Sequence, residues 1–356
     1  MEYKGLKIGD LTAKLPIIQG GMGIGVSKSK LAGAVAKAGG VGVISAVGIG
    51  FEESDFYNNT LKANLRALGK EIKKAKEIAV DGIVGVNILV AVNNYKELVL
   101  EAVKSKVDLI ISGAGLPMQL PELVKGSNTK IAPIVSSAKA AKVICKRWDK
   151  KSNRIPDLII VEGRKAGGHL GFKREEIESG EVRDLEQIIV EVIEEVKVFE
   201  QKYNKEIPVV AAGGIFDGKD IVKFLKLGAK GVQMGTRFIG TEECDADINY
   251  KKAFINAKEE DISLVKSPVG LPGRAIRNNL VNTIEKEDIK VSKCFNCLVP
   301  CKPSTTPYCI SQALIDAVHG DVENGLIFTG TNGYRINEIS TVEKLMNELE
   351  EEIGDN

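Results

Sequence analysis

The sequence predicts an α/β protein: a (β/α)8 barrel, or TIM barrel, followed by a C-terminal extension that forms a small cap. Short apolar runs rich in β-branched residues alternate with stretches of helical periodicity, and this alternation ends near residue 240 of 356. The runs lack polar alternation, which is typical of parallel strands buried on both faces. Eight such units over about 240 residues favour a barrel. A doubly wound open sheet is the alternative.

The eight expected strands are apolar runs such as "VGVIS" and "PDLIIVEG". They are residues 15–19, 41–45, 83–90, 107–113, 130–136, 156–163, 207–214 and 231–238. The stretches between them place apolar residues three and four apart, which predicts amphipathic helices. The clearest are residues 29–39, 95–105, 138–148, 185–201 and 220–228. Residues 46–60 are long for a strand-to-helix turn, so we expect a lid over the barrel mouth there.

We expect two parts, with residues 1–240 as the barrel and residues 241–356 as the extension. Composition excludes several partners. The net charge is +1, so no strong field attracts nucleic acid. The chain has no apolar run of the roughly 18 residues that a membrane helix needs, and no secretory signal pattern. We therefore expect a cytoplasmic protein that binds a small molecule, and we leave open assembly into a homo-oligomer.

Glycines gather where four of the expected strands end. The stretches are "QGGMG" (19–23), "EGRKAGGHLG" (162–171), "AAGGI" (211–215) and "QMGTRF" (233–238). Glycine often terminates strands, but in a barrel the carboxyl ends of the strands also form the active site. Loops after the seventh and eighth strands commonly bind phosphate through backbone N–H groups. Gly214, Gly235 and the hydroxyl of Thr236 are thus predicted to hold the phosphate of a cofactor.

The chain has two histidines, and His169 lies among the glycines after the sixth strand. Loops that follow barrel strands carry catalytic groups, so we interpret His169 as catalytic, on a flexible loop. The alternative is a surface histidine without a role. His319 precedes Gly320 at the end of an expected helix, and we expect it to cap that helix.

Five motifs in order resemble the nitronate monooxygenases, which are FMN-containing barrels related to the flavin-dependent enoyl-acyl-carrier-protein reductases. The motifs are "PIIQGGMG", "GVNILV", "AGGHLG", "PVVAAGGI" and "GVQMGTRF". The resemblance covers roughly residues 10–240. It implies that the protein is an FMN-dependent oxidoreductase that oxidises alkyl nitronates with O2 and needs no nicotinamide.

The resemblance also implies roles for individual residues. Met22 and Gly23 would lie against the flavin ring, Asn87 would hydrogen-bond it, Glu162 and Gly167 would line the cofactor, and His169 would be catalytic. Gly214 with Gln233, Met234, Gly235 and Thr236 would hold the phosphate.

Three residues need a separate account. Members of the family often carry Gln where this chain has Glu162, and an acidic residue where this chain has Lys165. A carboxylate near a flavin disfavours the anionic reduced form, so either Glu162 points away or the redox tuning differs. Lys165 changes the charge preference for the substrate. Lys139, after the fifth strand, either faces the flavin or a phosphate, or is a solvated lysine in the first turn of a helix.

The extension contains a cluster of cysteines. Cys145 and Cys244 stand alone, whereas Cys294, Cys297, Cys301 and Cys309 follow the pattern C-x2-C-x3-C-x7-C. Four thiols in sixteen residues predict zinc or an iron–sulfur cluster, although neither standard spacing is matched. The alternative is a set of reduced core cysteines. Residues 267–278, "SPVGLPGRAIRN", resemble a segment at the substrate mouth of many flavin barrels, and residues 341–353 predict a closing amphipathic helix.

Three functions remain open at this point. The first is oxidation of alkyl nitronates with O2. The second is reduction of enoyl thioesters or quinones, which uses the same flavin but requires hydride from NAD(P)H. The third, from another class, is a non-catalytic sensor of a phosphate ligand built on a barrel.

Overall fold

The structure is a computed structural model that describes residues 5–268 and 270–356, so residues 1–4 and Val269 of the 267–278 segment lie outside it. The predicted barrel is confirmed, because eight parallel strands close on themselves in the order β10-β11-β3-β4-β5-β6-β7-β8, with β8 paired to β10. This closure excludes the open sheet. The strands are β3 (Ile17–Gln19), β4 (Val41–Ser45), β5 (Ile83–Asn87), β6 (Leu109–Ser112), β7 (Lys130–Val135), β8 (Ile159–Glu162), β10 (Val209–Ala212) and β11 (Gly231–Met234).

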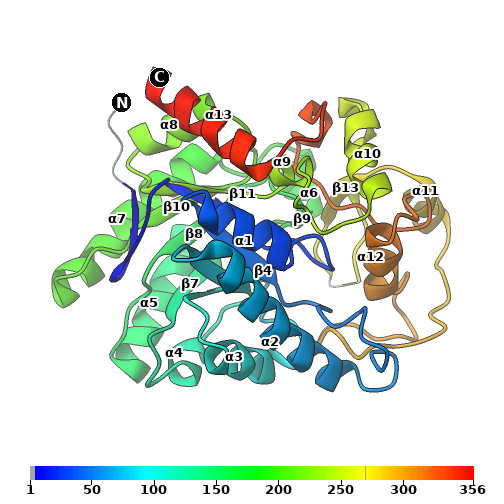
Figure 1. The fold of residues 1–356 in the computed structure, drawn as a ribbon, viewed down its shortest axis with the longest axis horizontal. Helices are drawn as coiled ribbons and strands as arrows, with labels where there is room; N and C mark the ends of the chain where they lie inside the picture. The colour runs from blue at the N-terminus through cyan, green and yellow to red at the C-terminus, as the bar shows by residue number, and fades with distance from the viewer. Residues whose placement is uncertain (1–4, 269) are drawn as a thin grey trace.

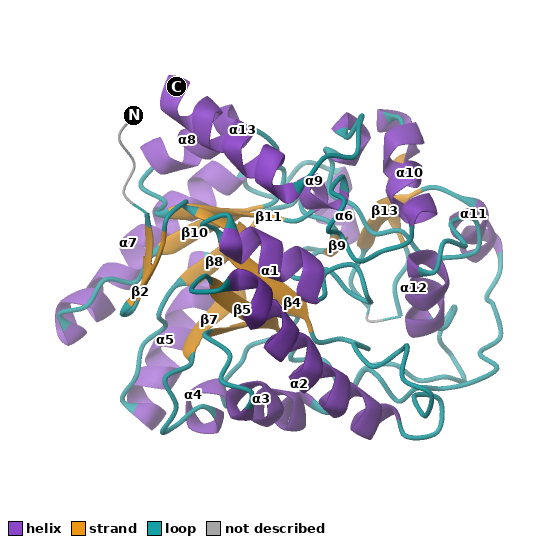
Figure 2. Ribbon diagram, viewed as in Figure 1, coloured by secondary structure: helices purple, strands orange, loops and turns teal. Residues whose placement is uncertain are grey.

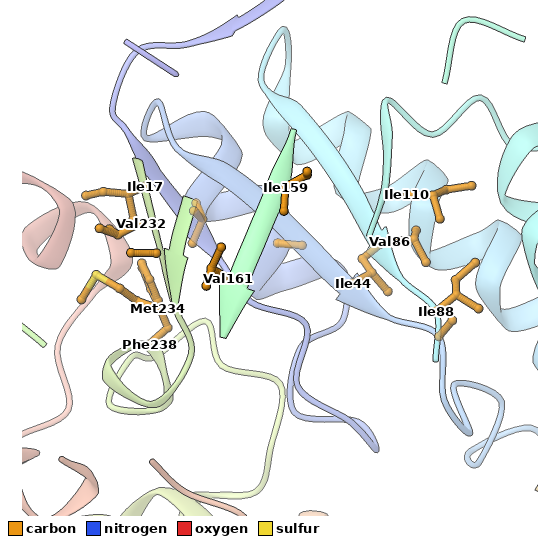
Figure 3. Close-up of a cluster of buried hydrophobic side chains, with 14 of the residues drawn as sticks. Ile17, Ile44, Val86, Ile88, Ile110, Ile159, Val161, Val232, Met234 and Phe238 are labelled. Atoms are coloured by element: carbon orange, nitrogen blue, oxygen red, sulfur yellow. The ribbon is translucent and has the colours of Figure 1, made fainter. Parts of the chain in front are cut away.

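Helices surround the strands (Figures 1 and 2). In chain order they are α1 (Ser29–Lys37), α2 (Thr60–Ala79), α3 (Tyr95–Lys104), α4 (Leu120–Leu123), α5 (Ala138–Ser152), α7 (Leu185–Tyr203) and α8 (Gly218–Lys226). Between strands and helices lies a layer of branched aliphatic side chains that includes Ile44, Val86 and Val161, all fully buried (Figure 3). Each such side chain contributes about 1.5–3 kcal/mol by leaving water.

The last helix of the ring comes from the end of the chain. The eighth strand is followed by the short α9 (Thr236–Ile239), whereas α13 (Val342–Asp355) packs against α8 and α1 (Figure 1). The Glu352 carboxylate accepts from the Gly218 N–H at 2.5 Å. The expected closing helix is therefore present, and the ring draws on both sides of residue 240. The division of the chain at that residue stays a prediction.

A β-hairpin closes the amino end of the barrel. The sequence did not predict it. Strands β1 (Leu6–Ile8) and β2 (Leu11–Ala13) pair antiparallel just before β3 begins. Leu6 and Ile8 are fully buried and pack with inward-facing residues of the barrel strands. This end of the barrel is thus filled with apolar side chains.

Residues 241–340 form the cap beside the barrel (Figure 1). Its elements are α10 (Ile248–Asn256), two 3-10 turns (Glu259–Asp261 and Gly333–Arg335), β12 (Ile262–Val265), β13 (Gly273–Ile276), α11 (Asn279–Lys286) and α12 (Ile310–Val318). Strands β12 and β13 extend an antiparallel sheet to β9 (Gly168–His169), which lies between β8 and α6 (Arg174–Glu178). Among the described helices, none is both long and apolar enough to cross a bilayer.

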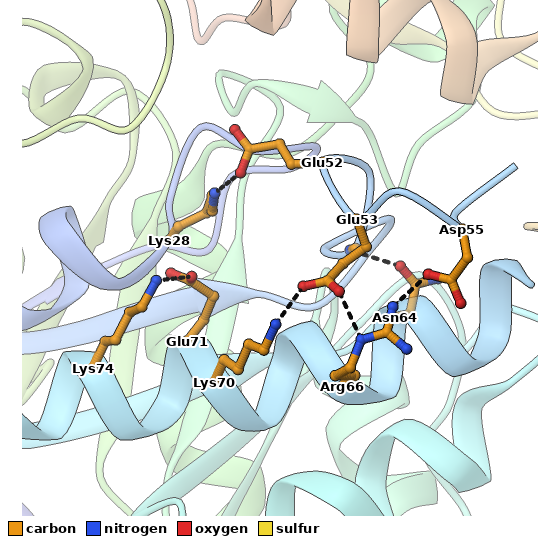
Figure 4. Close-up of polar contacts among 10 residues, drawn as sticks. Lys28, Glu52, Glu53, Asp55, Asn64, Arg66, Lys70, Glu71 and Lys74 are labelled. Atoms are coloured by element: carbon orange, nitrogen blue, oxygen red, sulfur yellow. Dashed lines mark hydrogen bonds and ion pairs between the residues drawn. The ribbon is translucent and has the colours of Figure 1, made fainter.

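The segment predicted as a lid is fastened in place. Phe51 and Phe56 are buried, and the Phe56 ring stacks on Phe295 of the cap with centroids 5.5 Å apart. The Glu53 carboxylate pairs with Arg66 of α2 at 2.6 Å and with Lys70 at 2.9 Å (Figure 4). These contacts favour a fixed wall between α2 and the cap, and they give no support to a movable lid.

Candidate active site

A cavity of about 640 Å³ opens at the carboxyl ends of the barrel strands. Its lining includes all eleven residues predicted for cofactor and catalysis: Met22, Gly23, Asn87, Glu162, Gly167, His169, Gly214, Gln233, Met234, Gly235 and Thr236. Residues as far apart in the sequence as Met22 and Thr236 meet here because the carboxyl ends of parallel strands face one way. Their individual roles stay predictions.

The glycines after β3 allow close packing between strands. A Cβ atom on Gly21 would lie 2.5 Å from Cβ of Asn87, and one on Gly23 would lie 2.3 Å from a methyl of Val47. Real Cβ contacts are never so short, so larger residues would displace the neighbouring chain. The Ser27 hydroxyl accepts from the Met22 N–H at 2.8 Å and holds this turn. These two glycines therefore serve packing of the cavity wall.

The expected phosphate pocket lies between the loops after β10 and β11. Gly214 has a φ of +80°, which L side chains rarely adopt, and a Cβ atom there would meet Cβ of Lys165 at 2.8 Å. The Thr236 hydroxyl accepts from the Gly330 N–H at 2.9 Å, so its own proton is available to a ligand. Asn332 donates to the Gly214 carbonyl at 2.8 Å. A loop of the cap thus backs this pocket.

Gln233 presents a buried acceptor without a partner. Its Oε1 atom makes no hydrogen bond within the described part of the chain, and its side chain lines the cavity. Leaving a buried acceptor unsatisfied costs about 1–3 kcal/mol. The site therefore suits a ligand that donates a hydrogen bond to Gln233.

Glu162, at the end of β8, also lines the cavity, so the carboxylate does not point away from the expected ring position. Burial raises the pKa of Glu162 to about 7, and no charged neighbour opposes this effect. Near neutral pH the carboxyl group is thus partly protonated and able to donate a hydrogen bond.

His169 does not lie on a flexible loop, as the sequence suggested, because it forms β9 and pairs with β13 of the cap. His169 is opposite Gly273, and Gly168 is opposite Arg274. The ring Nε2 atom lies 2.6 Å from the Ser267 hydroxyl, and the ring meets Phe328 edge-on with centroids 5.2 Å apart. Burial lowers the pKa of His169 to about 4, so the imidazole is neutral at pH 7.

Arg274 fixes the loop that carries His169. Its buried Nη1 atom donates to the carbonyls of Arg164 and Ala166, at 2.8 and 2.5 Å. Arg274 and Ser267 belong to the segment whose resemblance predicted a place near the mouth, and their contacts with this loop agree with that. Sequence reasoning missed both residues individually. It also missed the loop at 328–333, although its glycine-rich "FTGTNG" resembles the other cavity stretches.

The remaining candidate residues differ in whether they line the cavity. Lys165 lines the cavity, whereas Lys139 is exposed in the first turn of α5 and is absent from the lining, which fits its solvated alternative. His319 caps the end of α12, as expected, with its ring centroid 5.2 Å from that of Phe51.

The clustered cysteines are all free thiols. In residues 5–268 and 270–356, no three His, Cys, Asp or Glu side chains are placed to hold a metal ion, which counts against both zinc and an iron–sulfur cluster at these cysteines. The four thiols nevertheless line one small cavity of about 20 Å³ beside α12. Cys297, Cys301 and Cys309 are half-buried and pack against the hydrophobic core, whereas Cys294 is exposed, so the structure favours the alternative of reduced, mostly packed cysteines.

The barrel and the cavity at its carboxyl ends define an enzyme-like (β/α)8 protein. The family model described as nitronate monooxygenase matches residues 4–352, so the chain belongs to the nitronate monooxygenase family. This is a family of oxidoreductases, and it supports a flavin as the cofactor. A probable nitronate monooxygenase of Staphylococcus saprophyticus is 28% identical over 320 residues, which are 80% of this chain and 81% of that protein.

A second relative is itself named for a CoA thioester. It is the (3aS,4S,5R,7aS)-5-hydroxy-7a-methyl-1-oxo-octahydro-1H-indene-4-carboxyl-CoA dehydrogenase of Rhodococcus jostii, 27% identical over 270 residues. These are 76% of this chain, and they span 65% of the length of that relative.

Solved structures agree with the fold. FabK from Thermotoga maritima superposes with a TM-score of 0.74 at 27% identity, covering 96% of this chain and 94% of that one. The nitroalkane oxidase of Streptomyces ansochromogenes has a TM-score of 0.73 at 22% identity, covering 96% of each chain, and supports the fold alone.

Proposed function

We propose that the protein is an FMN-dependent nitronate monooxygenase that oxidises alkyl nitronates with O2. The observation that carries the proposal is the convergence of the eleven predicted residues on one cavity at the carboxyl ends of the strands, in a chain of this family.

The residues of the cavity fit FMN. The phosphate would lie between Gly214 and Thr236, which both line the cavity and where the proton of the Thr236 hydroxyl is available. The ring would lie near Met22. The unpaired Gln233 Oε1 atom is an acceptor, so it would suit an N–H of the ring better than the phosphate to which the sequence assigned Gln233. When bound, FMN supplies an acceptor for two electrons that O2 can reoxidise.

His169 is the group that moves a proton. As a neutral imidazole on the cavity wall, it can accept the proton from the carbon beside the nitro group when the substrate arrives as a neutral nitroalkane, which yields the nitronate. The Ser267 hydroxyl at 2.6 Å holds the ring in one orientation, and Phe328 packs against its other side. Pairing of β9 with β13 fixes the backbone at this position, which is what general-base catalysis requires.

The second candidate is reduction of an enoyl thioester with NAD(P)H. Its support is the Rhodococcus relative, whose name carries a CoA thioester, and the outer cavity wall, where Leu271, Leu298 and Leu314 offer apolar surface to an acyl chain. The sensor alternative has no comparable support, because the family is one of enzymes.

Anaerobic stopped-flow absorbance separates the two candidates. Propyl-2-nitronate should bleach the flavin within the time of one turnover, whereas NADH and NADPH should leave it oxidised. Rapid bleaching by a nicotinamide and none by the nitronate would reject nitronate oxidation in favour of the reductase.

A further inference from the structure

The main cavity at the carboxyl ends of the strands carries few charged groups. Among the described residues that line it, Glu162 has the one carboxyl group and Lys165 is the one lysine or arginine. A phosphate monoester carries close to two negative charges at pH 7, because its second pKa is about 6. Burying such an anion is costly unless a cation pairs with it. A phosphate ligand of this cavity therefore needs a positive charge nearby.

Lys165 lies on the rim of the expected phosphate pocket. A Cβ atom on Gly214 would lie 2.8 Å from Cβ of Lys165 and 2.9 Å from its Cδ, so the aliphatic stem of the lysine packs against this glycine. The Lys165 carbonyl accepts from the Thr331 N–H at 3.2 Å. The preceding residue, Gly330, donates to the Thr236 hydroxyl on the other side of the pocket. Both the side chain and the backbone of Lys165 thus contact the segments that enclose the pocket.

The ammonium group of Lys165 forms no ion pair within the described part of the chain, and the residue is exposed. Arg164, next to it in the sequence, is already paired with Asp184 at 2.9 Å. The pKa of Glu162 is raised by burial, with no opposing effect of a cation, so Lys165 does not pair with that carboxyl group. The charge of Lys165 is therefore available to a ligand.

We propose that the ammonium group of Lys165 pairs with the phosphate of the cofactor, a proposal that rests on the FMN site of the proposed function. The stem packs against Gly214, and the flexible end of the side chain lets the ammonium group turn into the pocket. Lysine binds phosphate as a point charge. The sequence linked Lys165 to the charge of the substrate, but its packing against Gly214 favours the phosphate end of the site.

This charge gives the pocket a selectivity that its other groups do not provide. The Thr236 hydroxyl and the backbone N–H groups are neutral donors. Attraction between two exposed charges, in contrast, weakens as the ionic strength rises. Lys165 should therefore favour FMN over riboflavin, which has the same ring but no phosphate, and should make FMN binding depend on salt.

The test is flavin titration of the full-length protein freed of its cofactor, measured by quenching of flavin fluorescence. Lys165→Met keeps the stem and removes the charge. It should raise the Kd for FMN about 5- to 20-fold, which lies between the effects of exposed ion pairs and of charge-assisted hydrogen bonds. The Kd for riboflavin should change less than about twofold, because no ion pair is lost. Lys165→Arg should keep the FMN affinity within about threefold, since it retains the charge.

Lys139→Met is the matched control, because Lys139 is an exposed lysine outside the cavity lining. Its affinities for both flavins should equal those of the wild type. A rise from about 0.05 to about 0.5 M salt should weaken FMN binding more in the wild type than in Lys165→Met. This salt dependence decides the question even if riboflavin binds too weakly to measure.

Three outcomes would overturn the proposal: unchanged FMN affinity in Lys165→Met, equal weakening for FMN and riboflavin, or the same salt dependence in the variant and the wild type. A raised KM for propyl-2-nitronate with unchanged FMN affinity would also overturn it, because the charge would then act on the substrate. Wild-type protein that binds no FMN would reject the proposed function and this proposal together, whereas each of the other outcomes leaves the proposed function standing.

Discussion

The two ends of the barrel use the same strands for opposite purposes. At the amino end, Leu6 and Ile8 of the hairpin fill the interior and are fully buried. At the carboxyl end, glycines leave a cavity of about 640 Å³ whose polar atoms include an unpaired acceptor on Gln233. The closed end therefore stabilises the fold, and the open end leaves groups unsatisfied for a ligand.

The largest effect is expected at the open end, at His169. His169→Asn should slow turnover of a neutral nitroalkane by about 10²- to 10⁴-fold, because general-base catalysis is lost. A preformed nitronate needs no proton removed, so its rate should stay substantial, and the variant should keep its FMN. Steady-state rates with the two substrates measure this difference.

His319→Asn is the matched control, since the other histidine caps α12 away from the cavity.

Because burial lowers the pKa of His169 to about 4, the wild-type rate should hold down to about pH 5. Equal rates of wild type and His169→Asn with both substrates would remove the histidine from the mechanism.

A substitution in the closed end of the barrel should lower the stability of the fold without loss of the cofactor. Leu6→Ala should lower the free energy of unfolding by about 2–5 kcal/mol, because it leaves a void at the closed end. FMN affinity should change less than about threefold. Urea unfolding and flavin titration measure the two quantities. Val198→Ala, at an exposed position, should change stability by less than about 0.5 kcal/mol.

Gly235 tests the phosphate pocket. Gly235→Asp should weaken FMN binding at least about 100-fold, because a carboxylate would displace charge-assisted bonds that contribute roughly 1.5–3 kcal/mol each. Gly235→Ala is the control, since its Cβ would meet only the flexible Met22 thioether at 3.3 Å. Isothermal titration with FMN should show near wild-type affinity for alanine. Full flavin occupancy in the aspartate variant would place the phosphate elsewhere.

The smallest expected effect concerns Glu162. Its pKa, about 7, lies above the ordinary value of 4.5, so the folded protein binds more protons than the unfolded chain between these pH values. Stability of the cofactor-free protein therefore falls as pH rises through this window. Glu162→Gln should remove that loss, a gain of up to about 3 kcal/mol at pH 8 relative to pH 4.

Urea unfolding of the cofactor-free protein at the two pH values measures this gain. Glu175→Gln, at an exposed position on α6, is the control and should show none. If the free energies of unfolding of Glu162→Gln and wild type differed by the same amount at all pH values, the carboxyl group would be solvated.

Much of the barrel was predictable because each strand carries its own apolar pattern. "VGVIS" and "IVGVN" became β4 and β5. Gly214, Gly235, Thr236 and His169 followed from where the strands end, whereas the other cavity residues were implied by the family resemblance. The pairing of His169 with Gly273 was not predictable, since it joins residues more than one hundred positions apart through backbone bonds. The hairpin at Leu6 was missed because two strands of three residues are too short for a periodic pattern.

The most direct test of the account is the identity and amount of cofactor in protein purified under mild conditions. The pocket between Gly214 and Thr236 predicts a yellow protein that releases one FMN per chain on denaturation, identified by mass spectrometry. A folded protein that carries no flavin and does not bind added FMN, or one that releases FAD, would contradict it.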